Sequence, residues 1–150
     1  MAEGKRHVLV VDDDAEVRGL LTSLLTRRKM LVDQATDGAE ALDLLKKNKY
    51  AVVLLDLMMP RVSGREVLDA IERTAMQPVV LVVTHVDREQ LGDLDSRRIH
   101  GIVHKPFDPD DLGDVVVQCA EIRGRGGFEA MAVSTLLSTI PLLALLTFNS

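Results

Sequence analysis

The fold of this chain is decided by the stretch VLVVDDD at residues 8–14, where four apolar residues run directly into three aspartates. A second apolar run, Val52–Leu55, ends in the same way at Asp56. Two further apolar strings end in polar residues, one in Thr84 and the other in Lys105. If these runs are parallel strands of one sheet, their polar ends emerge at the same edge. Carboxylates, a hydroxyl and an ammonium gathered there predict a site for a divalent cation and a phosphoryl group.

The rest of the chain alternates between strands and helices. Further strands are predicted near residues 31–35, 79–83 and 101–104, and helical segments near 14–25, 37–48, 63–71, 87–100 and 108–119. Asp14 and Asp108 are each placed to cap a helix, and helical spacing is clearest in the helix that begins after Asp14. Its apolar positions are Val17, Leu20, Leu21, Leu24 and Leu25. Five strands alternating with helices predict an α/β fold, a doubly wound five-stranded parallel sheet with helices on both faces.

Composition narrows the classes of function. The 150 residues are 47% hydrophobic but only 3% aromatic, so the chain can form one aliphatic core. The formal net charge is -5, and no basic stripe with interleaved aromatics is present, which argues against nucleic-acid binding by this chain alone. Cys119 is the single cysteine, and the charged N-terminus lacks the apolar segment of a secretory signal. We therefore expect a reducing, cytoplasmic location.

Over roughly residues 5–122 the sequence resembles the receiver domain of two-component response regulators. The matching pieces are Val11-Asp12-Asp13, Asp56-Leu57-Met58-Met59-Pro60, Val83-Thr84 and Lys105-Pro106-Phe107. Each piece is weak alone, because an aspartate after a strand is often only a turn or cap residue. Their order and spacing make the resemblance strong. It implies a flavodoxin-like sheet with strand order 2-1-3-4-5, and a cis peptide bond between Lys105 and Pro106.

The resemblance also implies a role for each site residue. Asp56 would accept a phosphoryl group from a phosphohistidine on a sensor histidine kinase or a phosphotransfer protein. The expected Mg²⁺ ligands are Asp12, Asp13, Asp56 and the backbone carbonyl of Met58. Thr84 would hydrogen-bond a phosphoryl oxygen, and Lys105 would pair with Asp56 and then with the phosphate.

Elementary chemistry agrees with these roles. Mg²⁺ prefers oxygen ligands and is commonly held by a few carboxylates and phosphate oxygens. Phosphoryl transfer needs mainly positioning and charge neutralisation, which Mg²⁺ and Lys105 would supply around Asp56. Asp14 is interpreted as a helix cap rather than a ligand.

Some positions depart from the family pattern. Ile102 stands where many receivers carry an aromatic residue, so that part of the switch is expected to be absent or muted. His85 follows Thr84 and is either a surface histidine or a lid over the pocket. Met58 and Val86 stand where polar side chains of fast members help to place the hydrolytic water. Neither can orient water by a strong hydrogen bond, which predicts a long-lived phosphorylated state. The remaining histidines, His7, His100 and His104, have no shared metal-ligand spacing and are interpreted as structural or solvated.

The composition changes sharply after the last predicted helix. We expect a receiver domain at residues 1–122, and a linker with an apolar C-terminal extension at 123–150. Residues 130–148 carry no charge and as a helix would span about 28 Å, close to the thickness of a bilayer core. Pro141 and five Ser/Thr residues weigh against a membrane anchor. A packing or dimerising helix is favoured over membrane contact, and a cloning or frame artefact is a third explanation.

Two functional hypotheses follow. The favoured one is a phosphorylation-switched signalling receiver: not an enzyme, but a module that assists its own phosphotransfer and dephosphorylation and acts on a downstream protein of unspecified identity. The alternative is a Mg²⁺-dependent phosphatase similar to the haloacid dehalogenases, which also use an aspartate after a strand. That family has a second acid two residues after the nucleophile and then a Gly-Thr type turn. Here the aspartates are followed by Ala15-Glu16, which disfavours the alternative.

Overall fold

The computed structural model of the protein describes residues 6–59, 64–74, 77–85, 99–124 and 146–147. The described part alternates strands and helices as the sequence predicts. Its elements are β1 (His7–Val11), α1 (Ala15–Arg27), β2 (Leu31–Ala35), α2 (Gly38–Lys47), β3 (Val52–Leu55), α3 (Gly64–Glu72), β4 (Val79–Thr84), β5 (Gly101–His104), α5 (Pro109–Gly124) and β6 (Leu146–Thr147).

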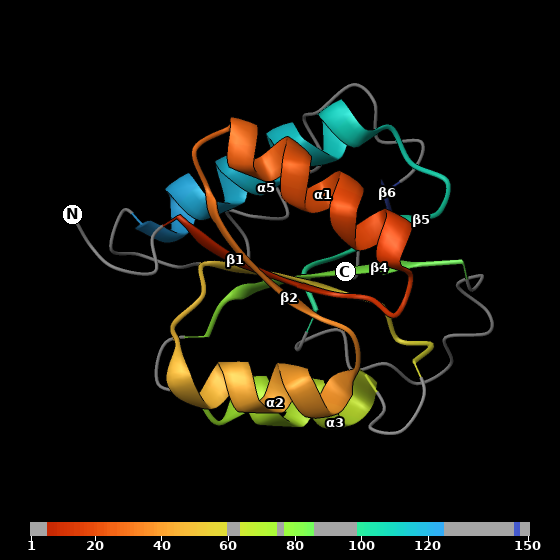
Figure 1. Ribbon diagram of the computed structural model, residues 1–150. Helices are drawn as coiled ribbons and strands as arrows, with labels where there is room; N and C mark the ends of the chain where they lie inside the picture. The colour runs from red at the N-terminus through yellow and green to blue at the C-terminus, as the bar shows by residue number, and fades with distance from the viewer. Residues whose placement is uncertain (1–5, 60–63, 75–76, 86–98, 125–145, 148–150) are drawn as a thin grey trace.

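The sheet has the order β2-β1-β3-β4-β5-β6. Its first five strands are parallel and confirm the predicted order 2-1-3-4-5. In Figure 1, α1 and α5 lie on one face of the sheet and α2 and α3 lie on the other. The sheet is therefore covered on both sides, and this explains why its central strands are continuous apolar runs rather than alternating ones.

Alternate residues of each central strand face different cores. Along β1, Val8 and Val10 pack with α1 and α5, whereas Leu9 and Val11 pack with α2 and α3. All residues of β3 and β4 are buried, including Thr84 at the end of β4. The two cores hold the strands in one register, so the position where each strand ends is fixed.

The helix starts follow the predicted capping residues. Asp14 accepts hydrogen bonds from the backbone N–H groups of Glu16 and Val17, and so begins α1. Asp108 accepts from Asp110 and Asp111 at the start of α5. Three of the five predicted apolar positions of α1, namely Leu21, Leu24 and Leu25, are buried, whereas Leu20 is 44% exposed.

The C-terminal end of the chain adds a strand that the sequence did not predict. Residues 146–147 form β6, which pairs antiparallel with β5, so these two residues are extended and not helical. Residues 125–145, where most of the predicted helix falls, lie outside the described residues, as do residues 87–98 of the helix predicted near 87–100. Residues 99–100 are described and are not helical. The last helix, α5, continues to Gly124, which is five residues beyond the helix predicted near 108–119 and two residues into the predicted linker. Within the described part of the chain, no helix combines the length and hydropathy needed to cross a bilayer.

Candidate functional site

The backbone places the predicted site residues at one edge of the sheet. Asp12 follows β1, Asp56 follows β3, Thr84 ends β4 and Lys105 follows β5. Backbone hydrogen bonds continue the sheet to these positions. The N–H of Asp56 donates to the carbonyl of Val11 at 2.9 Å, and the N–H of Lys105 donates to the carbonyl of Thr84 at 2.9 Å. These residues are therefore fixed relative to one another by the sheet itself.

Three carboxylates meet at this edge. One oxygen from each of Asp12, Asp13 and Asp56 lies within 4.8 Å of the others. Asp12 and Asp56 are only 2% and 6% exposed, whereas Asp13 is exposed. Oxygen ligands of this kind, with one open side, suit Mg²⁺, which usually keeps several waters. The acidic group can thus hold Mg²⁺, as the sequence predicted.

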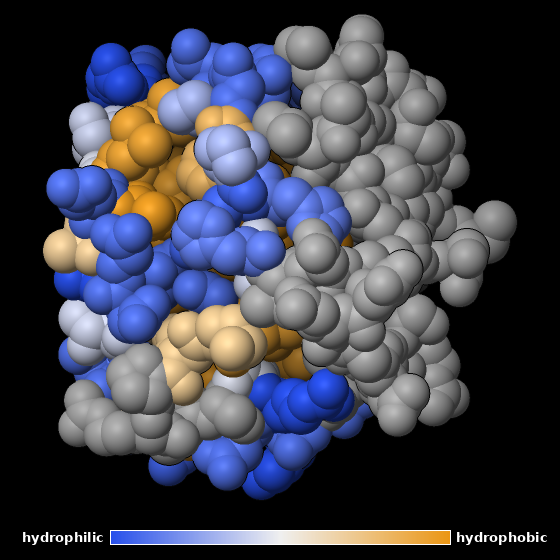
Figure 2. Space-filling model, turned by 90° about the vertical axis from the view of Figure 1, so that its right-hand side faces the viewer, coloured by the Kyte–Doolittle hydropathy of each residue, from blue (hydrophilic) through white to orange (hydrophobic). Residues whose placement is uncertain are grey.

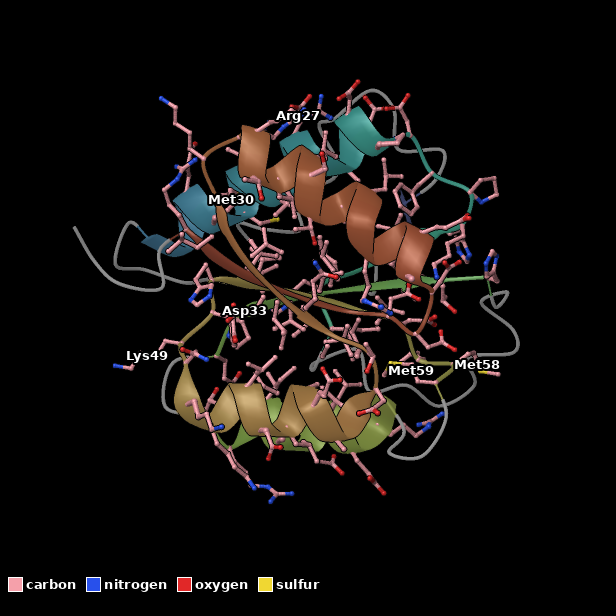
Figure 3. All side chains as sticks on the ribbon, viewed as in Figure 1. Arg27, Met30, Asp33, Lys49, Met58 and Met59 are labelled. Atoms are coloured by element: carbon pink, nitrogen blue, oxygen red, sulfur yellow. The ribbon has the colours of Figure 1, made fainter. Side chains whose placement is uncertain are left out.

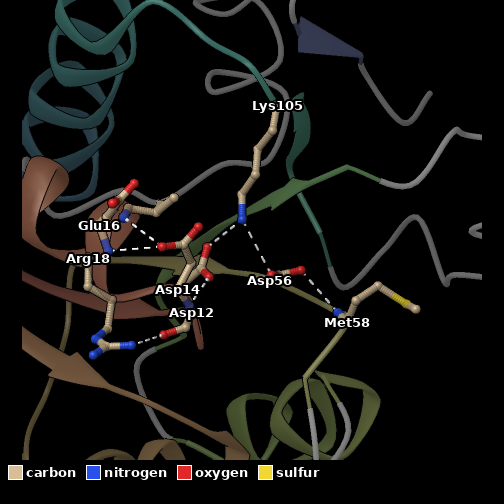
Figure 4. Close-up of polar contacts among 8 residues, drawn as sticks. Asp12, Asp14, Glu16, Arg18, Asp56, Met58 and Lys105 are labelled. Carbon is tan, nitrogen blue, oxygen red and sulfur yellow. Dashed lines mark hydrogen bonds and ion pairs between the residues drawn. The ribbon is translucent and has the colours of Figure 1, made fainter.

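Lys105 reaches into the acidic group from the end of β5. Its Nζ lies 2.6 Å from Oδ2 of Asp12 and 3.4 Å from Oδ2 of Asp56 (Figure 4). Burial alone would lower the pKa of the ammonium. The hydrogen bond to Asp12 and the charges of Asp56 and Asp12 outweigh burial and raise that pKa. Lys105 therefore stays cationic between two buried carboxylates. The peptide bond between Lys105 and Pro106 is cis, which confirms the prediction.

The surroundings of Asp56 raise the pKa of its carboxyl. Burial raises the pKa of its carboxyl, and the nearby charge of Asp12 raises it further. The N–H of Met58, which donates to Oδ1 of Asp56 at 3.0 Å, and the ammonium of Lys105 act in the opposite direction. A glycine is required beside this loop, since a Cβ on Gly64 would come within 2.9 Å of the Cα of Leu57.

The other predicted residues fall around this centre. Thr84 is fully buried at the end of β4, the strand next to the one that carries Asp56. His85 is exposed, which agrees with a surface histidine, and Val86 lies outside the described residues. Ile102 is buried in the core that contains α2 and α3. The side chain of Met58 is 65% exposed.

Three other titratable side chains singled out in the sequence have structural surroundings. The Nε2 atom of His7 lies 2.8 Å from a carboxylate oxygen of Asp33, and Nδ1 of His100 accepts from the N–H of Val80. The thiol of Cys119 is buried, and burial raises its pKa to about 12. It is inert, because the thiolate is the reactive form.

One residue at the site was missed by the sequence analysis. Arg18, on the first turns of α1, donates from Nη1 to the backbone carbonyl of Asp12 at 2.7 Å (Figure 4). In the sequence it is an ordinary charged position of an amphipathic helix. Because every residue carries a backbone carbonyl, no sequence pattern predicts which carbonyl Arg18 would contact.

A doubly wound sheet with acids and a buried lysine at its carboxyl edge places the protein among the receiver-type signalling domains. Comparison with known sequences agrees: a family model described as the response regulator receiver domain matches residues 8–117. The chain belongs to this family. The phosphatase alternative is not supported, because this match covers the sheet from β1 into α5.

Individual relatives show the same relationship. Response regulator MprA of a Mycobacterium species is 39% identical over 108 residues, which cover 71% of this chain and 46% of that protein. The response regulator TrrA of Thermotoga maritima, solved in complex with Mg²⁺ and BeF, is 32% identical with a TM-score of 0.67, covering 76% of this chain and 98% of that one. The BeF3-activated DrrB receiver domain is 27% identical with a TM-score of 0.69, covering 81% and 99%. The chain spans less than half the length of MprA.

Proposed function

We propose that Asp56 accepts a phosphoryl group from a phosphohistidine of a sensor histidine kinase or phosphotransfer protein, with Mg²⁺ held beside it. One observation carries the proposal. Lys105 bridges Asp12 and Asp56 inside a group of three carboxylates that can hold a divalent cation. This arrangement neutralises charge at the point where an anionic phosphoryl group would meet an anionic acceptor.

The chemistry assigns one task to each residue. An oxygen of Asp56 attacks phosphorus, and the bond between phosphorus and the histidine nitrogen breaks. The electron pair of that bond goes to the histidine ring, which carries a proton on its other nitrogen and so leaves as neutral imidazole. Mg²⁺, held by Asp12, Asp13, Asp56 and the carbonyl of Met58, would supply positive charge to the phosphoryl oxygens. The ammonium of Lys105 neutralises a second oxygen, and the hydroxyl of Thr84 donates to a third.

An apolar surface beside the site suits a partner protein. Figure 2 views the molecule from its right-hand side in Figure 1, and hydrophobic side chains gather on the part of this face where α1 lies. Leu20 of α1 is 44% exposed. A helix of the phosphodonor protein packed there would bring its phosphohistidine to Asp56. We place this exchange in the cytoplasm, and we assign no nucleic-acid contact to residues 1–122 alone.

The proposed module is a switch rather than an enzyme. It would receive one phosphoryl group, signal to a downstream protein, and lose the group slowly to water through its own site. Residues 1–122 would form the receiver, and residues 123–150 would form an extension that packs on the domain or joins a homodimer in preference to contacting a membrane.

Acetyl phosphate with Mg²⁺ tests the assignment. Intact-mass measurement should find one added phosphoryl group on the wild type and none on Asp56→Asn. The matched control is Asp14→Asn, which changes a nearby acid that caps α1. It should be labelled like the wild type. Undiminished labelling of Asp56→Asn would refute the acceptor, and turnover of many equivalents of acetyl phosphate would contradict a stoichiometric switch.

A further inference from the structure

We propose that Arg18 is a positioning residue for the Mg²⁺ site: by holding the carbonyl of Asp12, it fixes the peptide that carries Asp13. This inference rests on the proposed metal role of Asp12 and Asp13. It concerns a residue that touches neither the cation nor the phosphoryl group, but orients one of the ligands.

Every polar atom of Asp12 makes a hydrogen bond. Its N–H donates to the carbonyl of Ala35 at 3.1 Å, and its Oδ1 accepts from the N–H of Asp14 at 2.9 Å. Its Oδ2 accepts from Lys105 at 2.6 Å. The carbonyl oxygen is the remaining polar atom, and Arg18 binds it at 2.7 Å. Arg18 therefore completes the set of bonds that immobilises this residue.

Asp13 depends on that last bond more than Asp12 does. It is exposed, and among the described residues no hydrogen bond reaches its carboxylate. Its oxygen nevertheless lies within 4.8 Å of ligand atoms of Asp12 and Asp56. The backbone of Asp13 therefore sets the position from which its carboxylate reaches the group, because the Cα–Cβ bond is fixed by the backbone. Because a peptide bond is planar, holding the carbonyl of Asp12 also holds the N–H of Asp13.

Arg18 is itself well anchored. Its backbone N–H donates to the carbonyl of Asp14 at 3.0 Å, which ties it to the capped start of α1. Its side chain is half-buried against the turn of three aspartates. The guanidinium links α1 to the Asp12–Asp13 peptide, so the helix start and the ligand turn behave as one rigid unit. Partners that orient metal ligands in this way typically change metal affinity about 10–100-fold when they are removed.

The positive charge of Arg18 and its hydrogen bond to Asp12 have opposite effects on the affinity for Mg²⁺. A guanidinium near a cation site repels Mg²⁺, so removing the charge alone would tighten Mg²⁺ binding. Removing the positioning bond would weaken it. The sign of the change in affinity therefore separates the two roles.

The experiment is calorimetric titration of Mg²⁺ into the full chain carrying Arg18→Met, Arg18→Gln, Arg18→Lys or Arg27→Met. Arg27 is the matched control, because it is exposed at the far end of α1 and away from Met58 (Figure 3). Arg18→Met and Arg18→Gln should bind Mg²⁺ about tenfold more weakly, whereas Arg27→Met should match the wild type. Arg18→Lys keeps a donor that is one atom nearer the backbone than Nη1 of Arg18, whereas the amide donor of Arg18→Gln is two atoms nearer. Arg18→Lys should therefore bind at least as tightly as Arg18→Met.

A second readout follows the peptide directly. Without Mg²⁺, the amide NMR signal of Asp13 should broaden in Arg18→Met and stay sharp in Arg27→Met. If Arg18→Met does not fold, Arg18→Gln gives the same comparison. Unchanged or tighter Mg²⁺ binding by the Met and Gln variants would overturn the proposal, as would weaker binding by Arg18→Lys than by Arg18→Met. If those variants are still labelled at Asp56 at saturating Mg²⁺, the proposed function stands without this role of Arg18.

Discussion

The ammonium of Lys105 lies closer to Asp12 than to Asp56, at 2.6 Å from Oδ2 of the first and 3.4 Å from Oδ2 of the second. The family resemblance implies a pair with Asp56. In this structure, Lys105 is shared between the proposed acceptor and a proposed metal ligand, with the ligand as its nearer partner. Lys105 therefore competes with Mg²⁺ for Asp12, and any cation that enters must share the carboxylate with it.

This competition predicts opposite effects for one substitution. Lys105→Met should bind Mg²⁺ about tenfold more tightly, which is ~1.4 kcal/mol, because a positive charge leaves the site. Its labelling by acetyl phosphate should nevertheless slow sharply, since the phosphoryl group loses a cation. Lys49→Met is the control, because Lys49 is exposed and lies at the opposite end of the molecule from Met58 (Figure 3). Weaker Mg²⁺ binding by Lys105→Met would show that the lysine organises the ligands instead.

The raised pKa of Asp56 predicts a stability effect that depends on pH. The folded chain keeps a proton on this carboxyl to a higher pH than the unfolded chain, since burial disfavours the charge. Without Mg²⁺, stability therefore falls as pH rises from the ordinary carboxyl pKa to the raised one. Asp56→Asn removes this cost and should raise the melting temperature at neutral pH by a few degrees, or about 1 kcal/mol. The difference should vanish in acid.

Two control measurements test whether the pH-dependent change in stability comes from Asp56. Asp43→Asn, on the exposed face of α2, should leave the melting temperature and its pH dependence unchanged. Added Mg²⁺ should stabilise the wild type more than Asp56→Asn, because only the wild type has the full ligand set. Equal melting temperatures of wild type and Asp56→Asn at neutral pH without Mg²⁺ would contradict the cost assigned to the buried charge.

Substitutions of Asp13 and Asp14 should differ in their effects on Mg²⁺ affinity and on the free energy of unfolding. Asp13 belongs to the acidic group, whereas Oδ1 of Asp14 accepts the first backbone N–H groups of α1. Asp13→Ala should lose at least about tenfold in Mg²⁺ affinity, since a carboxylate ligand is removed. Asp14→Ala should keep that affinity but lose about 1 kcal/mol of unfolding free energy. Calorimetry and thermal melts measure the two effects, and equal losses of Mg²⁺ affinity would show that Asp14 is also a ligand.

The exposed side chain of Met58 should govern the lifetime of the phosphorylated state. Its backbone N–H binds Asp56, so the side chain stands beside the acceptor and 65% of it is exposed. A thioether cannot orient water by a strong hydrogen bond. Loss of phosphate should be slow and first-order, and several-fold faster in Met58→Asn. Met58→Leu is the matched control and should stay slow. A wild-type rate equal to that of Met58→Asn would show that the side chain of Met58 does not control the lifetime of the phosphorylated state.

The sheet and the site edge were predictable from sequence because their causes are local. A strand buried on both faces must be a continuous apolar run, and a polar residue that ends such a run must lie at the sheet edge. Asp14 and Asp108 were assigned as caps because an aspartate before a helical pattern has few other partners. The three carboxylates could therefore be placed together before any distance was known.

The features that were not predicted depend on contacts distant in sequence. Helical spacing marks Leu20 as apolar, but only packing decides which members of the stripe are covered. The preference of Lys105 for Asp12 is a difference between two distances across separate strands. The hydrogen bond from Arg18 is accepted by a backbone carbonyl. Because every residue carries such a carbonyl, no residue type in the sequence indicates this partner. The strand at 146–147 is too short for its own periodicity to be recognised.

That strand leads to a prediction for the edge of the sheet. Without β6, β5 would be the edge strand, and its outward backbone groups would be open to another chain. Ile102 pairs with Thr147, and Val103 with Leu146. The N–H of Lys105 points to β4, and amide directions alternate along a strand. The N–H of Val103 therefore faces β4, whereas that of Ile102 faces β6.

Removing residues 146–150 should accordingly change one amide and spare its neighbour. In hydrogen exchange followed by NMR, the amide of Ile102 should exchange about tenfold faster or more, because its partner strand is gone. The amide of Val103 should keep its rate, because β4 remains, and it serves as the control within the same molecule. The truncated chain should also self-associate more as its concentration rises, since an open edge can pair with a second copy. Equal exchange of Ile102 in the full and truncated chains would mean that residues 146–147 do not protect the edge in solution. Equal acceleration of both amides would mean that the truncation loosens β5 as a whole.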